Sequence, residues 1–464
     1  MASLPSQHFL SLGRPDAVSG PLPGMVDTTT LAAHDFDVDN RSGFMPPQVP
    51  VRRLPSSWEP WEVVLDEAMA GNLQLGDKPD LNEREVAEAE EWRARVRSLP
   101  VLPITELKSS EVNLRRGHLV LAWIMHYYIQ THSPTADVHI PPSITLPLLQ
   151  ICAQLQLPPV LTYADNTFYN WDLKVPQGEN EIPSLDNLRC PILFTGTEDE
   201  QEFYLASARI ELRGVEALEL MRATMDEAFV GDDIALRRIT SFLLRLAVVI
   251  KDLRELLLGV RKGCNPDIFY NQVRPWLRGL NSSSRKWVFE GLEDDPSLME
   301  PSELSGPSAG QSPLIHALDI FLGVDSFSHA SSNSGASPGV AAPSFLDRME
   351  LYMARHHRAF LNHLRLNPRP LRGMVLSADN APLLEAYNTA VVALKEFRDA
   401  HMIIVTMYIV GPSRRAQLTA AAPAESAPTG SEYSGPAPLK GTGGTDVVNF
   451  LKGVRDSTAE ALIH

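Results

Sequence analysis

The amino-acid sequence predicts an all-α fold. Apolar residues recur every three or four positions in several long segments, strand-like alternation is scarce, and prolines or capping residues stand where helices should begin. The 464 residues are enough to bury a large core without disulfides, and a break near 172–200 divides the chain. We expect a flexible tail over 1–33, a small helical domain over 34–185 and a large helical domain over 190–464.

The composition excludes several classes of protein. Hydrophobic residues make up 44% of the chain and charged residues 21%, which is typical of globular proteins. The formal charge of −16 argues against binding to nucleic acid phosphates. There is no signal peptide and no run of ~18 apolar residues, so we expect no membrane contact and a cytoplasmic location. Three cysteines, far apart in the sequence, suit a reducing compartment.

Four helices are predicted before the break. They cover about 80–96, 114–129, 146–155 and 160–171. Asp80 and Glu83 resemble a capping box for the first of them, whose charged face we expect to be mostly solvated. The second is amphipathic, and a proline pair precedes each of the last two, as proline at a helix start should.

Six helices are predicted after the break. They cover about 203–229, 232–262, 313–322, a basic stretch that contains His356, His357 and His363, 381–410 and 445–462. Asn380 or Asp379 can cap the fifth, and Gly411-Pro412 should end it. Small and polar residues predict loops over 303–313 and 324–343, and residues 412–439 predict a flexible loop.

The histidines of the fourth of these helices are weak candidates for a metal site. His356, His357 and His363 lie beside several arginines and far from any cysteine. Zinc sites usually combine histidine with cysteine or carboxylate ligands at short spacings. We therefore expect a solvated basic face here and no zinc.

His401 is the first candidate for chemistry. It lies on the apolar stripe of the 381–410 helix, near Phe397 and Ile404. Burying an imidazole costs free energy unless its nitrogens find partners. Two interpretations stay open: a core histidine bonded to a backbone carbonyl, or an axial haem ligand, which needs a neutral imidazole on a rigid helix. Arg398 is correspondingly either a surface arginine or the partner of a haem propionate.

The glycine-rich segment from Lys440 to Thr445 is the second candidate. Glycines before a helix can cradle an anion, but the Gly-Lys-Ser/Thr ending of a phosphate-binding loop is missing. A flexible helix cap and a hinge that closes over a site are the alternatives.

Several short segments, taken together, are distinctive. They are Leu-Pro-Pro-Val-Leu-Thr-Tyr-Ala-Asp (157–165), Phe-Tyr-Leu-Ala-Ser (203–207), Asn-Pro-Asp-Ile-Phe-Tyr-Asn-Gln-Val-Arg (265–274), Ser-Ala-Gly-Gln-Ser (308–312), His-Arg-Ala-Phe-Leu (357–361), Phe-Arg-Asp-Ala-His (397–401) and Gly-Thr-Gly-Gly-Thr-Asp (441–446). Their order and spacing resemble the indoleamine 2,3-dioxygenase family, in a fungal-type version, over about residues 34–464.

The resemblance implies a two-domain helical haem protein with haem b in the large domain. The implied reaction inserts both atoms of O2 across the indole C2–C3 bond of L-tryptophan and gives N-formylkynurenine. This is the first step of tryptophan catabolism through kynurenine toward NAD. The implied partners are L-tryptophan and O2, with iron in the ferrous state, and we expect a monomer.

The resemblance also assigns roles to individual residues. His401 aligns with the proximal iron ligand, Arg398 with a propionate partner, and Asp319 with an acidic group near that ligand. The remaining implied cofactor contacts are Ser308 and Ala309, of which Ala309 also aligns with the distal pocket. The implied substrate contacts are Tyr163, Phe203, Ser207, Phe269, Arg274 and Thr442. Ser207, Phe269 and Arg274 are expected to serve catalysis: Ser207 by contacting O2 or the indole N–H, Phe269 by holding the indole, and Arg274 by holding the carboxylate.

Three positions depart from the family pattern. Pro307 replaces a frequent glycine, and Asn166 replaces a small apolar or thiol residue at the base of the pocket. Pro275 should push Arg274 away from helical geometry. These departures leave two alternatives beside the dioxygenase. One is a haem protein of this fold with weak or no activity on tryptophan, and the other is a non-enzymatic helical interaction protein.

Overall fold

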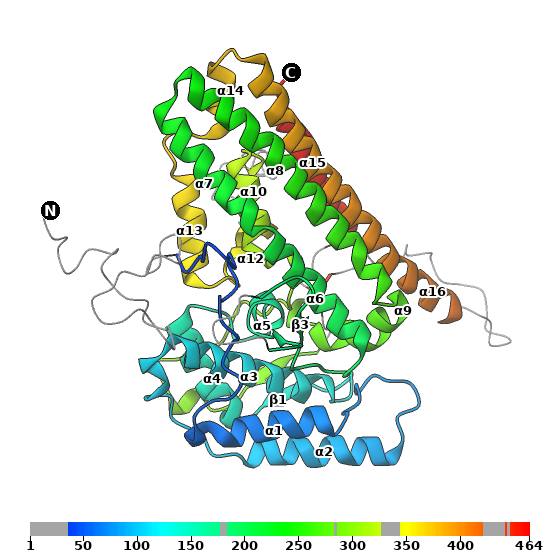
Figure 1. Ribbon diagram of the computed structural model, residues 1–464. Coiled ribbons are helices and arrows are strands. Elements are labelled where there is room, and N and C mark those ends of the chain that lie inside the picture. Colours follow the sequence, from blue (N-terminus) through cyan, green and yellow to red (C-terminus); the bar gives the residue numbers. More distant parts are fainter. Residues whose placement is uncertain (1–35, 177–182, 283–284, 326–343, 421–440, 443–445) are drawn as a thin grey trace, which may run out of the picture.

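The computed structural model describes residues 36–176, 183–282, 285–325, 344–420, 441–442 and 446–464 (Figure 1). Helices dominate this part of the chain, as predicted. The helices are α1 (Glu59–Ala70), α2 (Glu83–Ser98), α3 (Glu111–Gln130), α4 (Pro142–Leu155), α5 (Tyr163–Thr167), α6 (Glu198–Arg213), α7 (Val215–Val230), α8 (Asp233–Gly259), α9 (Pro266–Ile268), α10 (Pro313–Phe321), α12 (Phe345–Glu350), α13 (Arg355–Arg365), α14 (Leu371–Ser377), α15 (Ala381–Val405), α16 (Gly411–Ala420) and α17 (Val447–Glu460). The predicted tail over 1–33 and most of the predicted loops over 324–343 and 412–439 lie outside the described residues.

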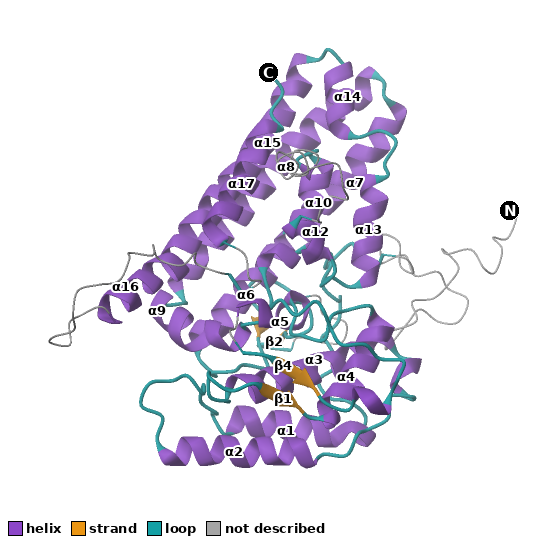
Figure 2. Cartoon of the chain, turned by 180° about the vertical axis from the view of Figure 1, so that it is seen from behind, coloured by secondary structure: helices purple, strands orange, loops and turns teal. Residues whose placement is uncertain are grey.

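The helices form two regions (Figures 1 and 2). Helices α1 to α4 lie together at one end, and the long helices α7, α8, α15 and α17 form an elongated bundle that extends away from them. Two small strand pairs accompany the helices: β1 (Val138–Ile140) is parallel to β4 (Trp287–Phe289), and β2 (Asp172–Leu173) is antiparallel to β3 (Leu188–Arg189). β1 belongs to the predicted small domain and β4 to the predicted large one. Their pairing shows that part of the predicted large domain packs against the predicted small domain.

The predicted amphipathic helix at 114–129 is buried on nearly every side. In α3, both the apolar stripe and the opposite face are covered, and Trp123 stacks on Phe194 with ring centroids 4.1 Å apart. His126, also fully buried, hydrogen-bonds the Trp276 carbonyl through Nδ1 at 2.8 Å. The helix is central because α1, α4 and the segment after α9 all pack on it.

Three predicted helix boundaries in the first half of the chain are wrong. The capping box of α2 uses Asn82 and Glu85, two residues later than expected. The helix expected over 160–171 is the five-residue α5. The helix expected over 203–229 is two helices, α6 and α7, which meet at Gly214. A Cβ atom on Gly214 would lie only 2.2 Å from Leu314 Cδ2, so a side chain at this position would displace Leu314.

The long helix around His401 continues beyond its predicted end. Asn380 caps α15 as expected, by accepting a hydrogen bond from the Leu383 amide. The π-helical turn Thr406–Val410 follows, and α16 begins at Gly411. The Gly411 amide donates to Thr406, five residues back, and Pro412 has no amide hydrogen for a regular helical bond. Gly411-Pro412 therefore widens the helix and does not end it.

The basic helix α13 is also more buried than expected. His357 is 1% exposed, and its ring packs against Phe44 and Phe168. Arg355 and His356 both contact Glu111 of α3, so this face is a packed junction between helices. Among the described residues, no helix is both long enough and apolar enough to cross a membrane.

Candidate active site

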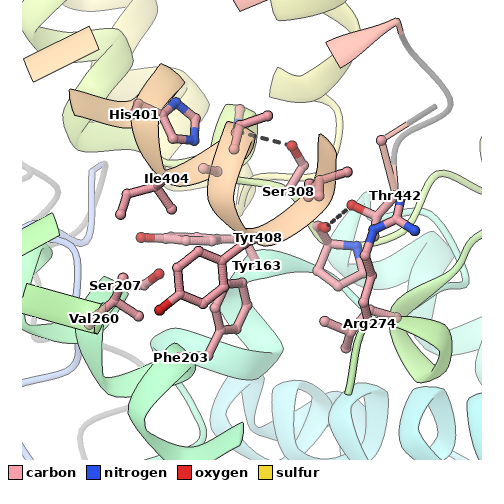
Figure 3. Close-up of a pocket in the computed structure, with 18 of the residues that line it drawn as sticks. Tyr163, Phe203, Ser207, Val260, Arg274, Ser308, His401, Ile404, Tyr408 and Thr442 are labelled. Atoms are coloured by element: carbon pink, nitrogen blue, oxygen red, sulfur yellow. Dashed lines mark hydrogen bonds between the residues drawn. The ribbon is translucent and has the colours of Figure 1, made fainter. Parts of the chain in front are cut away.

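A deep cavity lies where α5, α6, α15 and the segments after α8 and α9 converge (Figure 3). It encloses about 1330 Å³ of space between protein atoms, including its open mouth. Apolar and aromatic side chains make up most of its lining. The predicted site residues that line it are Tyr163, Phe203, Ser207, Phe269, Arg274, Ser308, Ala309, His401 and Thr442.

Changes of helical pitch place Phe269 and Arg274 in the cavity. Asn265 caps the short α9, a π-helical turn follows at Phe269–Val273, and a 3₁₀ turn begins at Arg274. Arg274 has helical backbone angles, φ −55° and ψ −36°. The expectation that Pro275 would exclude this conformation is therefore wrong, because the pitch changes around the proline while the backbone stays helical.

Aromatic side chains form one wall of the cavity. The Phe203 and Phe269 ring centroids are 4.3 Å apart, and Tyr408 meets Phe269 edge-on at 5.8 Å. Tyr408 is held in place because its hydroxyl donates to the Cys264 carbonyl at 2.6 Å. Such a wall fits the face of a flat aromatic ligand. Tyr408 lies two turns after His401, where periodicity places it on the same apolar stripe, and it belongs to the π-helical turn after α15.

His401 projects from α15 into the cavity (Figure 3). Burial, with a smaller effect of Arg398, lowers the pKa of His401 to about 4, so the ring is neutral at pH 7. Within the described part of the chain, neither ring nitrogen has a hydrogen-bond partner. The interpretation as a core histidine bonded to a carbonyl therefore loses its support. A neutral imidazole that faces a large apolar cavity is the form that ligates iron.

Asp319 and Arg398 lie behind this wall and are both buried. The Arg398 guanidinium bonds both carboxylate oxygens of Asp319, at 2.6 Å for Nη2–Oδ2, and also contacts Thr458 of α17. Neither residue lines the cavity, and Asp319 contacts the arginine rather than the imidazole. Their predicted roles beside haem stay predictions, and the pair itself ties α10 and α17 to α15.

Ser308 and Thr442 form part of the cavity rim. Ser308 caps a 3₁₀ turn by accepting a hydrogen bond from the Gly310 amide, at 3.2 Å. Thr442 donates from Oγ1 to the Pro307 carbonyl at 2.7 Å, and its own carbonyl accepts from Gly306 at 3.2 Å. Thr442, in the glycine-rich segment, is therefore docked on the loop that contains Pro307. The glycines at 443–444, which the hinge hypothesis requires, lie outside the described residues.

Sequence reasoning missed Glu211, a buried acid directly behind the cavity. It accepts hydrogen bonds from Tyr163 at 2.9 Å and from Ser312 at 2.5 Å, both at Oε1. Burial outweighs these two bonds and raises the pKa of Glu211 to about 7. The sequence spacing could have revealed this residue, because Glu211 lies on α6 one helical turn after Ser207 and two turns after Phe203, on the same face of the helix.

The raised pKa of Glu211 predicts a pH-dependent stability. The folded protein keeps a proton that the unfolded chain, with a carboxyl pKa near 4.5, releases. Stability should therefore fall as pH rises from about 4.5 to 7, by up to ~3 kcal/mol, and then level off. In Glu211→Gln this contribution should disappear. The free energies of unfolding measured in urea at pH 5 and at pH 8 should therefore differ less than they do in the wild type. Glu255→Gln, at an exposed site on α8, is the control. An unchanged pH dependence in Glu211→Gln would contradict the assignment.

The fold and the site together define a class of protein. It is a helical protein whose large apolar cavity combines a neutral histidine, an aromatic wall and a buried arginine, as a haem-dependent enzyme for an aromatic substrate requires. The family model described as indoleamine 2,3-dioxygenase matches residues 32–461. The chain belongs to the indoleamine 2,3-dioxygenase family.

Individual relatives agree with this assignment. Indoleamine 2,3-dioxygenase 2 of Homo sapiens is 31% identical over 447 residues, which cover 95% of this chain and 98% of the relative. Indoleamine 2,3-dioxygenase of Saccharomyces cerevisiae is 32% identical over 91% of this chain and 92% of its own length. A 6-hydroxytryptophan 2,3-dioxygenase of Fusarium equiseti is 28% identical over 94% of this chain and 99% of its own length. The predicted family, fold class and enzyme class are thus confirmed: the chain is a haem-dependent dioxygenase, an oxidoreductase.

Proposed function

We propose that the chain binds haem b through His401 and converts L-tryptophan and O2 to N-formylkynurenine. The observation that supports this most directly is the neutral imidazole of His401, which faces the cavity and has no hydrogen-bond partner among the described residues. When bound, ferrous haem supplies the binding and activation of O2. The side chains of the cavity hold and orient the substrate.

The chemistry of the cavity lining fits haem. The lining is mainly apolar, which suits the porphyrin faces, and His401 is the histidine among the lining residues. The ion pair between Asp319 and Arg398 fixes the turn of α15 that precedes His401. A rigid helix holds the imidazole in a single orientation, as an axial ligand requires.

The aromatic wall and Arg274 suit the two ends of tryptophan. Phe203 and Phe269 offer faces for the indole ring. Arg274 is 7% exposed, and burial lowers its pKa to about 10, so its guanidinium stays charged at pH 7. A desolvated guanidinium binds a carboxylate through two parallel hydrogen bonds. Ser207 adds a small polar group at the same cavity, within reach of O2 or the indole N–H in the proposed complex.

The purified protein tests this proposal in two measurements. A visible spectrum should show the strong Soret band of bound haem. Under reducing conditions with O2, L-tryptophan should be consumed as N-formylkynurenine appears. Haem without turnover would favour the alternative of a haem protein with little activity on tryptophan, and no haem would contradict the proposal. We expect the enzyme to act as a monomer in the cytoplasm, and size-exclusion chromatography checks the oligomeric state.

Hydroxylated tryptophan is a second candidate substrate. One relative is named for 6-hydroxytryptophan, and the cavity of this chain has a polar residue, Asn166, on its α5 wall. Turnover of tryptophan and of its ring-hydroxylated forms should therefore be compared from the start.

A further inference from the structure

The amide side chain of Asn166 is buried in the cavity wall without a partner. The residue is 4% exposed and lines the cavity, yet its Oδ1 atom has no hydrogen-bond partner among the described residues. Its Nδ2 atom likewise makes no hydrogen bond within this part of the chain. Burying an unsatisfied amide costs free energy that an apolar residue at the same place would avoid. Such a group is explained if the bound substrate supplies the missing partner.

The surrounding structure holds Asn166 in this position. Tyr163, Asn166 and Thr167 are three and four residues apart on α5, and all three line the cavity. The helix is fixed at its start by a capping box between Thr162 and Asp165. The Asp165 carboxylate also contacts His118 Nδ1 of α3 at 3.0 Å. With α5 anchored on both sides, Asn166 remains directed at the cavity.

Neighbouring polar groups of the cavity are already engaged elsewhere. The Tyr163 hydroxyl donates to Glu211, the Tyr408 hydroxyl to the Cys264 carbonyl, and the Thr442 hydroxyl to the Pro307 carbonyl. None of these hydroxyls donates to Asn166. Asn166 Oδ1 is enclosed, whereas Nδ2 is not among the enclosed unpartnered atoms of the described residues, so an acceptor on the ligand can complete the bonding of Nδ2.

Tryptophan has two donors and one strong acceptor, its carboxylate, and all three are expected to lie away from Asn166. Its ammonium group is next to the carboxylate and hence near Arg274 in the proposed complex. The indole N–H is bonded to C2, one of the two reacting carbons, and must lie near the iron held by His401. Figure 3 shows His401 and Arg274 at opposite ends of the drawn site, with Tyr163 of α5 between them. The ring edge that remains for α5 is the benzene edge, where tryptophan has neither a hydrogen-bond donor nor an acceptor.

We propose that Asn166 recognises a hydroxyl group on the benzene ring of the substrate. This inference rests on the proposed dioxygenase function and identifies its substrate class as ring-hydroxylated tryptophan. A phenolic hydroxyl both donates and accepts a hydrogen bond, and a carboxamide does the same through Oδ1 and Nδ2. A site built to bond a substrate hydroxyl discriminates against the analogue that lacks it, because its own polar group then stays unpaired. Asn166 is in this view a specificity-determining residue.

The test compares substrates within each enzyme. The haem-loaded wild type is assayed for kcat/KM on L-tryptophan and on the 4-, 5-, 6- and 7-hydroxy-L-tryptophans. We expect one hydroxylated form to exceed tryptophan about tenfold or more. Leucine has nearly the same volume as asparagine and no polar side-chain atom. In Asn166→Leu, the ratio of kcat/KM on the preferred hydroxylated form to kcat/KM on tryptophan should mostly disappear, while activity on tryptophan is kept. Thr167→Val removes a hydroxyl from the same wall and should keep the ratio.

The outcomes separate this inference from the proposed function. Absence of haem, or of product from every substrate, would contradict the dioxygenase proposal itself. Turnover of tryptophan without preference for any hydroxylated form would overturn only the role of Asn166. An equal loss on both substrates in Asn166→Leu would also overturn it, because the residue would then act on a group that both share. If Asn166→Leu fails to bind haem, spectral titration of the wild type with tryptophan and with each hydroxylated form decides the matter. Equal dissociation constants would overturn the inference, and at least tenfold tighter binding of one hydroxylated form would support it.

Discussion

Replacing His401 with alanine should remove most of the Soret absorbance of the purified protein. The imidazole is the proposed axial ligand, and the described lining of the cavity offers no second histidine to replace it. Apolar contacts alone would retain haem weakly and without the spectrum of histidine ligation. The measurement is haem content per chain together with the visible spectrum. Added free imidazole should restore part of the Soret band by filling the space left in His401→Ala.

The matched control is His139→Ala. His139 lies on β1 with a side chain 56% exposed, so its loss should leave haem content unchanged. Circular dichroism should show that both variants keep their helices. Full haem content with an unaltered spectrum in His401→Ala would exclude His401 as the ligand.

Replacing Arg274 with alanine should lower kcat/KM for L-tryptophan by ~30-fold or more. Removal of one partner from a buried charged pair typically costs ~2–5 kcal/mol, and each ~1.4 kcal/mol is a factor of ten. The effect should be much smaller for tryptamine, an indole amine without a carboxylate. Arg274→Lys should recover only part of the activity, because an ammonium keeps the charge and loses the paired geometry.

Arg278→Ala provides the comparison for Arg274→Ala. Arg278 follows on the same segment, where it forms a partly exposed ion pair with Asp77. Its removal should have little effect on either substrate, since exposed pairs contribute little. An equal loss on tryptophan and tryptamine in Arg274→Ala, or no loss on tryptophan, would remove Arg274 from the proposed site.

Local signals predicted the long helices well and their interruptions poorly. The Asn380 cap of α15 is a property of neighbouring residues, and the structure shows it where expected. The close packing of Gly214 on Leu314 and the burial of α3 both depend on segments far along the chain. Periodicity within a helix has no information about such partners.

The site residues were identified through the family resemblance more than through periodicity. Phe269 and Arg274 reach the cavity because of changes in helical pitch that no simple repeat predicts. The pair between Asp319 and Arg398 joins residues 79 positions apart, so its geometry follows only from the fold. Glu211 has the spacing of a cavity residue, but an acid in a helix usually indicates a solvated face.

Pro412 influences the shape of the cavity although it does not line it. A proline inside a regular α-helix would clash with the carbonyl four residues before it, and the π-helical turn Thr406–Val410 avoids that clash. Tyr408 and Ile409 belong to this turn and line the cavity, whereas Pro412 does not. A sequence change to alanine at 412 would let the turn tighten to the ordinary pitch, and the two side chains would rotate. Selection acting on this one proline could therefore reshape the space for substrate while every residue that touches substrate stays the same.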